Sequence, residues 1–250
     1  MTTPGKPLTD SPRLRRYFHD DAERLALTRA MFDHSADLYD RLERWTGLGR
    51  GPWYRRLVLQ RAGLKRGMRV LDVGTGTGLV AREALKLIGP EGRLTGLDPS
   101  PAMLAEARKA LPIETVEGYA EAIPLPGGQF DFISMGYALR HVTDLHATFR
   151  ECLRMLKPGG ILCILEPARP ENRLLRALLR VHLRYLVPAL TRLLLRRGDS
   201  AELWEYFWET IDASVPPETI RNALERAGFA EVRSRPTLGL LCEYCGRKPD

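Results

Sequence analysis

The sequence contains a glycine-rich turn of the kind that binds nucleotide-like ligands. In Val70-Leu71-Asp72-Val73-Gly74-Thr75-Gly76-Thr77-Gly78, an apolar segment with strand character leads into three closely spaced glycines. Glycines let the backbone turn sharply and let a ligand approach without meeting Cβ atoms. Open α/β sheets bind their ligands at the carboxyl ends of strands. We therefore expect Asp72, Gly74, Thr75, Gly76 and Gly78 to contribute to a cofactor site.

A second acid follows in Leu97-Asp98-Pro99-Ser100, about twenty residues beyond the glycines. An acid at this spacing can accept hydrogen bonds from both hydroxyls of a ribose. Because Gly76-x-Gly78-x-x-Ala81 also fits the dinucleotide fingerprint, NAD is a competing ligand. Asp72 argues against NAD, since a carboxylate ahead of the glycines suits a cationic aminoacyl group better than an anionic pyrophosphate. The sequence also shows no second mononucleotide-binding half.

Alternating strand and helix patterns must position these residues. Apolar runs with strand character lie at residues 68–73, 93–97, 113–116, 130–135 and 160–165, and helical patterns lie at 80–87, 102–111 and 146–156. This alternation predicts a parallel sheet with helices on both faces. Two last runs, at residues 230–235 and 239–245, predict an antiparallel hairpin. The expected fold is α/β and Rossmann-like, with a mostly parallel seven-stranded sheet.

Helical segments on either side of this alternation predict a cap over the sheet. The cap elements are expected at about residues 22–62 and 170–215, within a single domain of residues 16–250. Residues 1–15 are expected to be a disordered tail. A cluster of aromatic residues in the second cap segment either lines a pocket or docks a helix onto the core: Trp204, Tyr206, Phe207 and Trp208.

The cysteines and the start of the chain exclude other classes of site and location. Cys242 and Cys245 form a lone C-x-x-C without the second pair or the two histidines of a zinc site, so no metal is expected. Free thiols fit a reducing cytoplasm. The first residues have no apolar core of the secretory type. We therefore expect a cytoplasmic protein.

The net charge of +7 is concentrated in one segment. Eight arginines and one acid lie between Arg169 and Arg197. The helical spacing of Arg173, Arg176, Arg180 and Arg184 puts them on one face, and Leu175, Leu179, Leu183 and Leu186 also recur at near-helical spacing. This segment is either a helix that caps the site or an amphipathic helix that meets anionic membranes. No nucleic-acid motif accompanies the charge, so nucleic acid is not an expected partner.

Three motifs together resemble those of class I S-adenosylmethionine-dependent methyltransferases. They are Asp72-x-Gly74-x-Gly76-x-Gly78, Leu97-Asp98-Pro99-Ser100-x-x-Met103-Leu104 and Leu156-Lys157-Pro158-Gly159-Gly160. From about residue 31 onward the chain resembles, more narrowly, the ubiquinone/menaquinone biosynthesis C-methyltransferase family. The segments that carry this resemblance are Phe32-Asp33-x-x-Ala36-x-x-Tyr39-Asp40, Gly118-Tyr119-Ala120-Glu121-Ala122-Ile123-Pro124-Leu125 and Ala138-Leu139-Arg140-His141-Val142-Thr143-Asp144.

The resemblance implies the cofactor and adds residues to its site. The cofactor is S-adenosyl-L-methionine, and the implied additional contacts are Pro99, Met103, Tyr119, Ala120 and Glu121. The family usually has Asp where this chain has Tyr119, at a position implied to contact the adenine. It usually has Asn where this chain has His141. These departures bear on the acceptor more than on the cofactor.

The resemblance also places the acceptor and the chemistry. It points to Arg140 and its neighbour acting on a water, with Tyr39 positioning the acceptor or the cofactor. Because the pKa of arginine exceeds about 12, Arg140 suits stabilisation of a phenolate better than proton removal. His141, with an ordinary pKa near ~6.5, is the better proton acceptor. We expect the rate to rise through a pKa near ~6–7.

The expected activity is therefore methylation of an aromatic or quinone-like acceptor, most simply at carbon. One alternative is an O- or N-methyltransferase of specialised or lipid metabolism on the same fold. Another, of a different class, is a module that binds the cofactor without catalysis, although Arg140 beside His141 argues against it. The sequence leaves the oligomeric state open, with a homodimer as one option.

Overall fold

The computed structural model describes residues 20–46, 49–189 and 200–250. In these residues one sheet has the strand order β3-β2-β1-β4-β5-β7-β6. Its strands are β1 (Arg69–Val73), β2 (Arg93–Asp98), β3 (Glu114–Glu117), β4 (Phe130–Gly136), β5 (Leu156–Pro167), β6 (Ala230–Thr237) and β7 (Leu241–Arg247). Strands β1 to β5 pair in parallel, while β7 is antiparallel to both β5 and β6. The predicted mostly parallel seven-stranded sheet and its C-terminal hairpin are confirmed. The tail expected over residues 1–15 lies outside the described residues.

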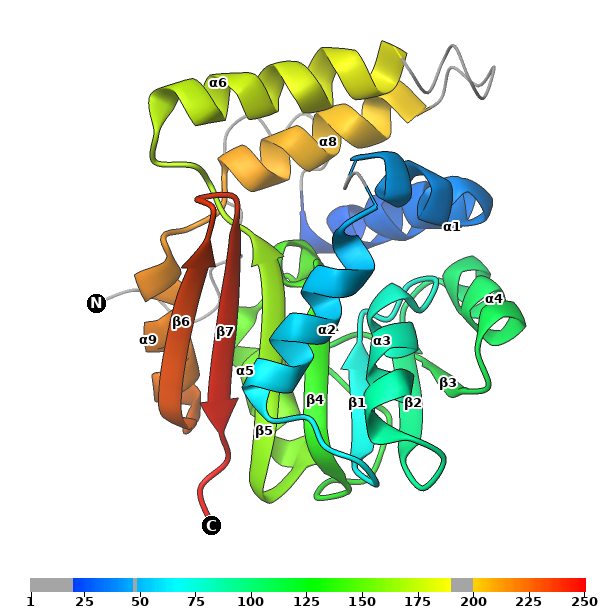
Figure 1. The fold of residues 1–250 in the computed structure, drawn as a ribbon, viewed down its shortest axis with the longest axis vertical. Helices are drawn as coiled ribbons and strands as arrows, with labels where there is room; N and C mark the ends of the chain where they lie inside the picture. The colour runs from blue at the N-terminus through cyan, green and yellow to red at the C-terminus, as the bar shows by residue number, and fades with distance from the viewer. Residues whose placement is uncertain (1–19, 47–48, 190–199) are drawn as a thin grey trace.

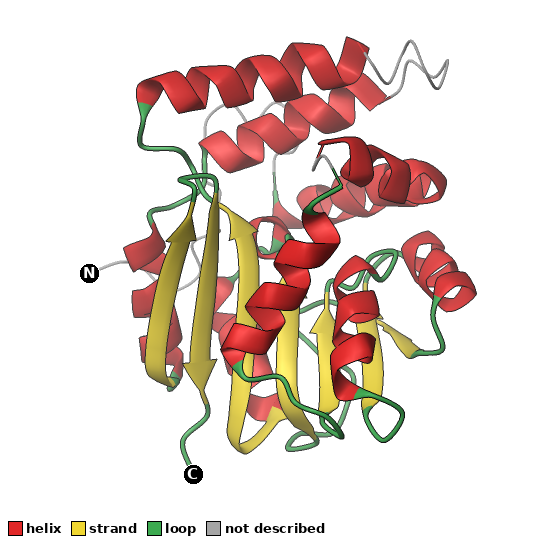
Figure 2. Cartoon of the chain, viewed as in Figure 1, coloured by secondary structure: helices red, strands yellow, loops and turns green. Residues whose placement is uncertain are grey.

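Helices connect the strands and cover both faces of the sheet (Figures 1 and 2). The elements are α1 (Asp21–Thr46), α2 (Gly51–Ala62), α3 (Leu79–Ile88), α4 (Pro101–Ala110), α5 (Leu145–Met155), α6 (Arg173–Val181), α8 (Ser200–Asp212) and α9 (Pro217–Ala227), with a 3₁₀ turn η2 (Leu139–His141) and a π-helical segment η3 (His182–Leu186). Helices α2 and α3 lie in front of the sheet in Figure 1, and α5 and α9 lie behind it.

Each face of the sheet has its own apolar core. In front, α2 and α3 contribute Val58, Leu59 and Ala81 to a buried cluster with the strands. Behind, α5 and α9 contribute Phe149 and Leu224 to another. Burial on both faces explains why the central strands read as continuous apolar runs in the sequence. Helix α2, expected as part of the cap, packs on this front face.

A third apolar cluster lies above the carboxyl edge of the sheet. Helices α1, α6 and α8 gather there (Figure 1). All four aromatic residues of the predicted cluster on α8 are buried, together with Leu183, Val187 and Ile211, and Phe32 and Tyr39 of α1 pack against them. Because the ligand edge of a parallel sheet is its carboxyl edge, these helices roof the place where the predicted site residues converge.

Two elements differ from their predicted bounds for local reasons. Strand β5 begins at Leu156 instead of residue 160, and its pairing with β4 shifts register between Phe130 and Phe132. Gly159 adopts a φ of +70°, which lets the strand absorb this irregularity and continue. The helix expected within the basic segment of residues 169–197 is α6 followed by the π-helical η3, and residues 190–199 lie outside the described part. Within the described residues no helix is long and apolar enough to cross a membrane.

Candidate active site

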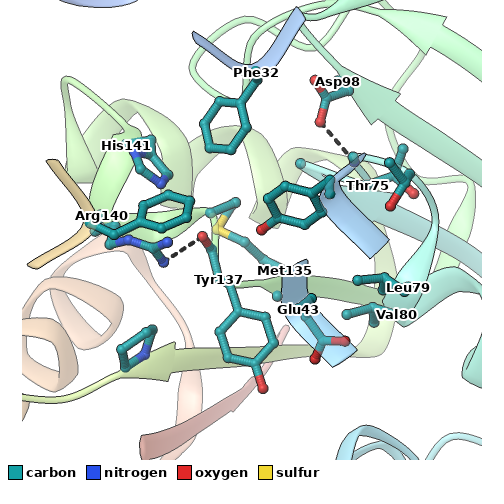
Figure 3. Close-up of a pocket in the computed structure, with 18 of the residues that line it drawn as sticks. Phe32, Glu43, Thr75, Leu79, Val80, Asp98, Met135, Tyr137, Arg140 and His141 are labelled. Atoms are coloured by element: carbon teal, nitrogen blue, oxygen red, sulfur yellow. Dashed lines mark hydrogen bonds between the residues drawn. The ribbon is translucent and has the colours of Figure 1, made fainter. Parts of the chain in front are cut away.

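A cavity of about 560 Å³ lies beneath the helical roof, at the carboxyl ends of β1, β2 and β4. This volume is within the range of small-molecule sites. Most residues predicted from the sequence line it, namely Gly74, Thr75, Gly76, Asp98, Pro99, Met103, Tyr119, Ala120, Glu121, Tyr39, Arg140 and His141. Figure 3 shows Asp98 and Thr75 on one side of this cavity and Arg140 and His141 on the other, with Phe32 between them. The cavity therefore joins the two predicted groups of residues.

The glycine-rich turn has the backbone that its sequence requires. Gly74, Gly76 and Gly78 have φ values of +67°, +55° and +87°, a region that other residues seldom adopt. A Cβ on Gly74 would collide with the Cβ of Ala138. A Cβ on Gly76 would instead project into open space, with no atom within 4 Å. The turn thus presents bare backbone to the cavity, as a closely bound cofactor needs.

Asp98 stands at the end of β2 with its carboxylate against the glycine turn. Its Oδ2 accepts a hydrogen bond from Gly76 N at 2.8 Å, and its Oδ1 accepts one from Ser100 N at 2.9 Å. Burial raises the pKa of Asp98 to about 6, and the carboxylates of Asp72 and Asp33 contribute to the rise. Each oxygen retains acceptor capacity for a ligand hydroxyl.

Asp72 lies below the turn and outside the cavity wall, as does Gly78. Its carboxylate accepts hydrogen bonds from Thr75 Oγ1 at 2.8 Å and from Ser134 Oγ at 2.6 Å. Burial raises its pKa to about 6, although both hydroxyl donors oppose the rise. In this structure Asp72 fastens the turn to β4, so it acts on a cofactor through Thr75 and the backbone.

Arg140 is buried in η2 and held in place by an acid that the sequence did not single out. Its Nη1 donates to Glu166 Oε1 at 2.9 Å and to the carbonyl oxygen of Tyr137 at 2.6 Å. Its guanidinium also lies over the ring of Phe207, 5.2 Å from the centroid. Glu166 comes at the end of β5, and an acid at the carboxyl end of a parallel strand was the available signal for it.

His141 is enclosed by aromatic side chains from both the first and the last cap helices. Its Nδ1 lies 3.2 Å from the Tyr206 hydroxyl, and the Phe32 ring meets it edge-on with centroids 5.3 Å apart. Among the described residues, its buried Nε2 has no hydrogen-bond partner. Burial, together with the charges of Arg140 and Arg24, places the pKa of His141 well below 6.5. The pKa near 6–7 expected from the ordinary value of histidine is therefore too high, because the side chain is buried beside two arginines.

Tyr39 comes from α1 and lies within the electrostatic reach of Arg140 and Arg55. Burial raises the pKa of its phenol, while these two cations oppose the rise. Its ring meets Phe32 edge-on at 6.0 Å between centroids. The three residues predicted to act on an acceptor, Arg140, His141 and Tyr39, are thus brought together from η2 and α1 at one cavity.

A search of family models confirms the suggested relationship. The model described as the ubiE/COQ5 methyltransferase family matches residues 20–248. This chain belongs to the ubiE/COQ5 methyltransferase family. It is 31% identical over 237 residues to the ubiquinone/menaquinone biosynthesis C-methyltransferase UbiE of Shewanella halifaxensis, covering 91% of this chain and 93% of the relative. It is 34% identical over 215 residues to the 2-phytyl-1,4-naphtoquinone methyltransferase of Thermosynechococcus vestitus, covering 84% and 94% respectively.

The fold agrees with this ubiE/COQ5 membership. A SAM-dependent methyltransferase from Aquifex aeolicus has a similar fold, with a TM-score of 0.61 at 21% identity over 84% of this chain and 97% of that one. The protein is thus an S-adenosylmethionine-dependent methyltransferase of the ubiE/COQ5 family. The site fits this cofactor, because an acid with open acceptor positions faces a glycine turn that leaves room for a ligand.

Proposed function

We propose that the protein transfers the methyl group to a ring carbon of a quinol-like, hydroxylated aromatic acceptor. Of the relatives named above, one is a C-methyltransferase of ubiquinone/menaquinone biosynthesis and the other is a 2-phytyl-1,4-naphtoquinone methyltransferase. The observation that carries the proposal is the placement of Arg140 and His141 on the same cavity as Asp98 and the glycine turn. The surrounding wall is rich in aromatic and aliphatic side chains, among them Phe32, Trp204 and Phe207, which suits an apolar ring.

The proposed roles follow from the geometry of each residue. S-adenosylmethionine supplies a methyl group already activated by its sulfonium sulfur. Asp98 holds the ribose hydroxyls, and the glycine turn lets the cofactor approach the backbone. Arg140, fixed by Glu166, stabilises the acceptor oxygen as it loses its proton. His141 takes that proton on Nε2, which has no other partner among the described residues. Once the ring carbon carries the new methyl group, the hydrogen on that carbon leaves as a proton to solvent, which restores the aromatic ring. The remaining protein walls exclude water from the transfer.

We also propose that α6 rests on the surface of anionic membranes when it receives a lipophilic acceptor. Leu174, Leu178, Val181 and Tyr185 recur along one side of α6 and η3, and each is strongly exposed. Arg176 and Arg184, expected on one face with Arg173 and Arg180, are paired with Asp212 and Glu205 of α8. The outward face is therefore apolar and is flanked by the exposed cations Arg173 and Arg180.

The mouth of the cavity is consistent with this orientation. Trp53 and Leu238 line the cavity, yet their side chains are 66% and 86% exposed. Leu238 is at the tip of the β6–β7 hairpin, and a Cβ on the next residue, Gly239, would lie 3.4 Å from Leu175 of α6. An apolar acceptor that leaves a bilayer in contact with the outward face of α6 would meet Trp53 and Leu238 at the entrance of the cavity.

Product analysis tests the proposed acceptor class. The purified enzyme would be incubated with S-adenosylmethionine and a panel of quinols, simple phenols and amines under reducing conditions. We expect a mass gain of one methylene on quinols, with the new methyl on a ring carbon by NMR. Methylation confined to oxygen or nitrogen would favour the alternative methyltransferases on this fold. Cofactor binding without turnover of any acceptor would favour a non-catalytic module.

A further inference from the structure

A second buried ion pair lies on the wall of the cavity, apart from Arg140 and Glu166. Arg55 of α2 donates from Nη2 to Glu43 Oε1 of α1 at 2.6 Å. The Arg55 side chain is only 2% exposed, and both residues line the cavity. Gly51 leaves room for the pair, because a Cβ there would collide with Glu43 and come within 2.6 Å of Arg55 Nη1.

The guanidinium of Arg55 has more donors than this structure uses. Among the described residues, its Nε and Nη1 are buried without a hydrogen-bond partner. Leaving a buried, charged donor unsatisfied is costly, so such groups are expected to meet a ligand or an ordered water. Arg55 lines the cavity, and a small rearrangement of the groups packed over its guanidinium would bring these two donors within reach of a ligand oxygen.

Tyr137 contacts both Arg55 and Arg140. The carbonyl oxygen of Tyr137 accepts from Arg140, while the ring of Tyr137 lies beneath Arg55 with 5.3 Å from its centroid to Cζ. Figure 3 shows this residue extending from the Arg140 side of the cavity, with its ring near Glu43. The two cations are thus held at the two ends of one tyrosine residue.

We propose that Arg55, oriented by Glu43 and Tyr137, forms a second oxygen-binding subsite that recognises a ring oxygen other than the one held by Arg140 and His141. This inference rests on the proposed function, since it requires a hydroxylated aromatic acceptor. The planar guanidinium offers its free edge to a hydroxyl or carbonyl oxygen. Arg55 then selects acceptors that carry two ring oxygens over those that carry one.

Calorimetry on the enzyme loaded with S-adenosylhomocysteine tests this subsite without turnover. The probes are para-dihydroxynaphthalene, kept reduced, and the corresponding naphthol with a single hydroxyl. We expect wild type to bind the diol about 10- to 100-fold more tightly, as one charge-assisted hydrogen bond predicts. Arg55→Met should reduce this ratio to near one by weakening only diol binding. An unchanged ratio in Arg55→Met would overturn the inference.

Two further variants separate recognition from folding. Arg56→Met is the matched control, because Arg56 is the neighbouring arginine of α2 and its partner Glu83 keeps a second cation, Lys86, at 2.6 Å. It should keep the wild-type ratio, and loss of the ratio here would also overturn the inference. Because Arg55→Met leaves Glu43 without its arginine, the double variant Glu43→Gln/Arg55→Met removes both charges and should also show a ratio near one.

Turnover of the two probes then separates this inference from the proposed function. A normal affinity ratio with no methylated diol would contradict the proposed acceptor chemistry while supporting the Arg55 subsite. Methylation of both probes with equal affinity in wild type would support the proposed function and overturn the subsite. In steady-state kinetics, Arg55→Met should raise KM for the diol more than it lowers kcat.

Discussion

The carboxylate of Asp98 and the backbone amide of Gly76 are joined by a hydrogen bond of 2.8 Å, which ties the end of β2 to the glycine turn after β1. This contact holds the Asp98 carboxylate beside Gly76. Of the three glycines from Gly74 to Gly78, Gly76 is the one at which an added Cβ would have no atom within 4 Å. A ligand lying against the bare backbone of Gly76 is therefore within reach of the Asp98 oxygens. Two predictions rest on this arrangement.

Replacing Asp98 should weaken cofactor binding. In Asp98→Ala, each charge-assisted hydrogen bond lost to a ribose hydroxyl should cost about 1.5–3 kcal/mol of binding free energy. Titration calorimetry with S-adenosylhomocysteine measures this change. Glu114→Ala, an exposed acid on the neighbouring strand β3, is the control and should bind normally. Equal affinity in wild type and Asp98→Ala would remove the ribose assignment.

Cofactor affinity should also fall in acid. Because burial raises the pKa of Asp98 to about 6, the free enzyme takes up a proton on this group as the pH falls through that value. The carboxylate form accepts from two hydroxyls more strongly than the protonated acid, so tight binding favours loss of this proton. Below pH 6 the dissociation constant should rise by up to about tenfold per pH unit. Calorimetry at several pH values checks this, and a pH-independent constant between 5 and 7 would contradict it.

Membrane contact should depend on the outward face of α6. Leu178→Asp places a charge in the middle of the exposed apolar side, and Arg180→Glu reverses a flanking cation, which near an anionic surface is worth about 1 kcal/mol. Both variants should sediment less with vesicles containing phosphatidylserine, and high salt should reduce binding of wild type. Arg66→Glu changes an exposed arginine before β1, at the opposite edge of the sheet, and is the control. Equal sedimentation of wild type with vesicles that contain or lack anionic lipid would exclude the proposed contact.

The success of sequence-based prediction differs between local and tertiary features. The glycine turn was predictable because left-handed backbone after a strand demands glycine within a few residues. Asp98 was predictable because an acid about twenty residues beyond such glycines is typical of a ribose-binding site. Arg55 and Glu43 were not, because each matters through a partner on another element. Glu166 carried a signal, its place at the carboxyl end of a parallel strand, but its role depends on Arg140 of another element. The proton affinity of His141 was misjudged for the same reason, since the residues that bury it come from α1 and α8.

Periodicity also left the orientation of α6 open. Spacing alone put four arginines on one face, and in the structure Arg176 and Arg184 of that face turn towards acids on α8. A helical repeat identifies which residues share a side, but the position of α8 decides which side is buried. Leu174 and Leu178, which the helical repeat did not single out, are exposed in the structure.

Glu166 should be required for both stability and catalysis. Glu166→Ala removes one partner of a buried ion pair and leaves Arg140 without its carboxylate, which typically costs about 3–5 kcal/mol of unfolding free energy. Glu166→Gln keeps the shape and an acceptor oxygen, so it should fold better while orienting Arg140 less firmly. Urea unfolding measures the first effect, and kcat at saturating acceptor measures the second. Wild-type kcat in a folded Glu166→Gln variant would show that Arg140 needs no charged anchor.

His141→Asn tests the proposed base and also restores the residue usual in the family. If His141 removes the acceptor proton, the variant should lose about 10²–10⁴ in rate while binding the cofactor normally. Because the pKa of His141 lies well below 6.5, the neutral base is present throughout neutral pH. The wild-type rate should therefore be flat above pH 6.5 with respect to this group and fall only in more acidic solution, and the variant should lack that acid limb.

The same depressed pKa links His141 to folding. The unfolded chain takes up a proton on this histidine below pH 6.5, whereas the native state does not until the pH is lower. The stability that this neutral histidine contributes is therefore complete above pH 6.5. It is lost as the pH falls from 6.5 towards the lower pKa of the native state. His141→Asn should flatten this part of the urea-unfolding profile. If the variant changes this profile but keeps the wild-type rate, His141 is a buried neutral packing residue, and methyl transfer depends on Arg140 and an acceptor that ionises without a protein base.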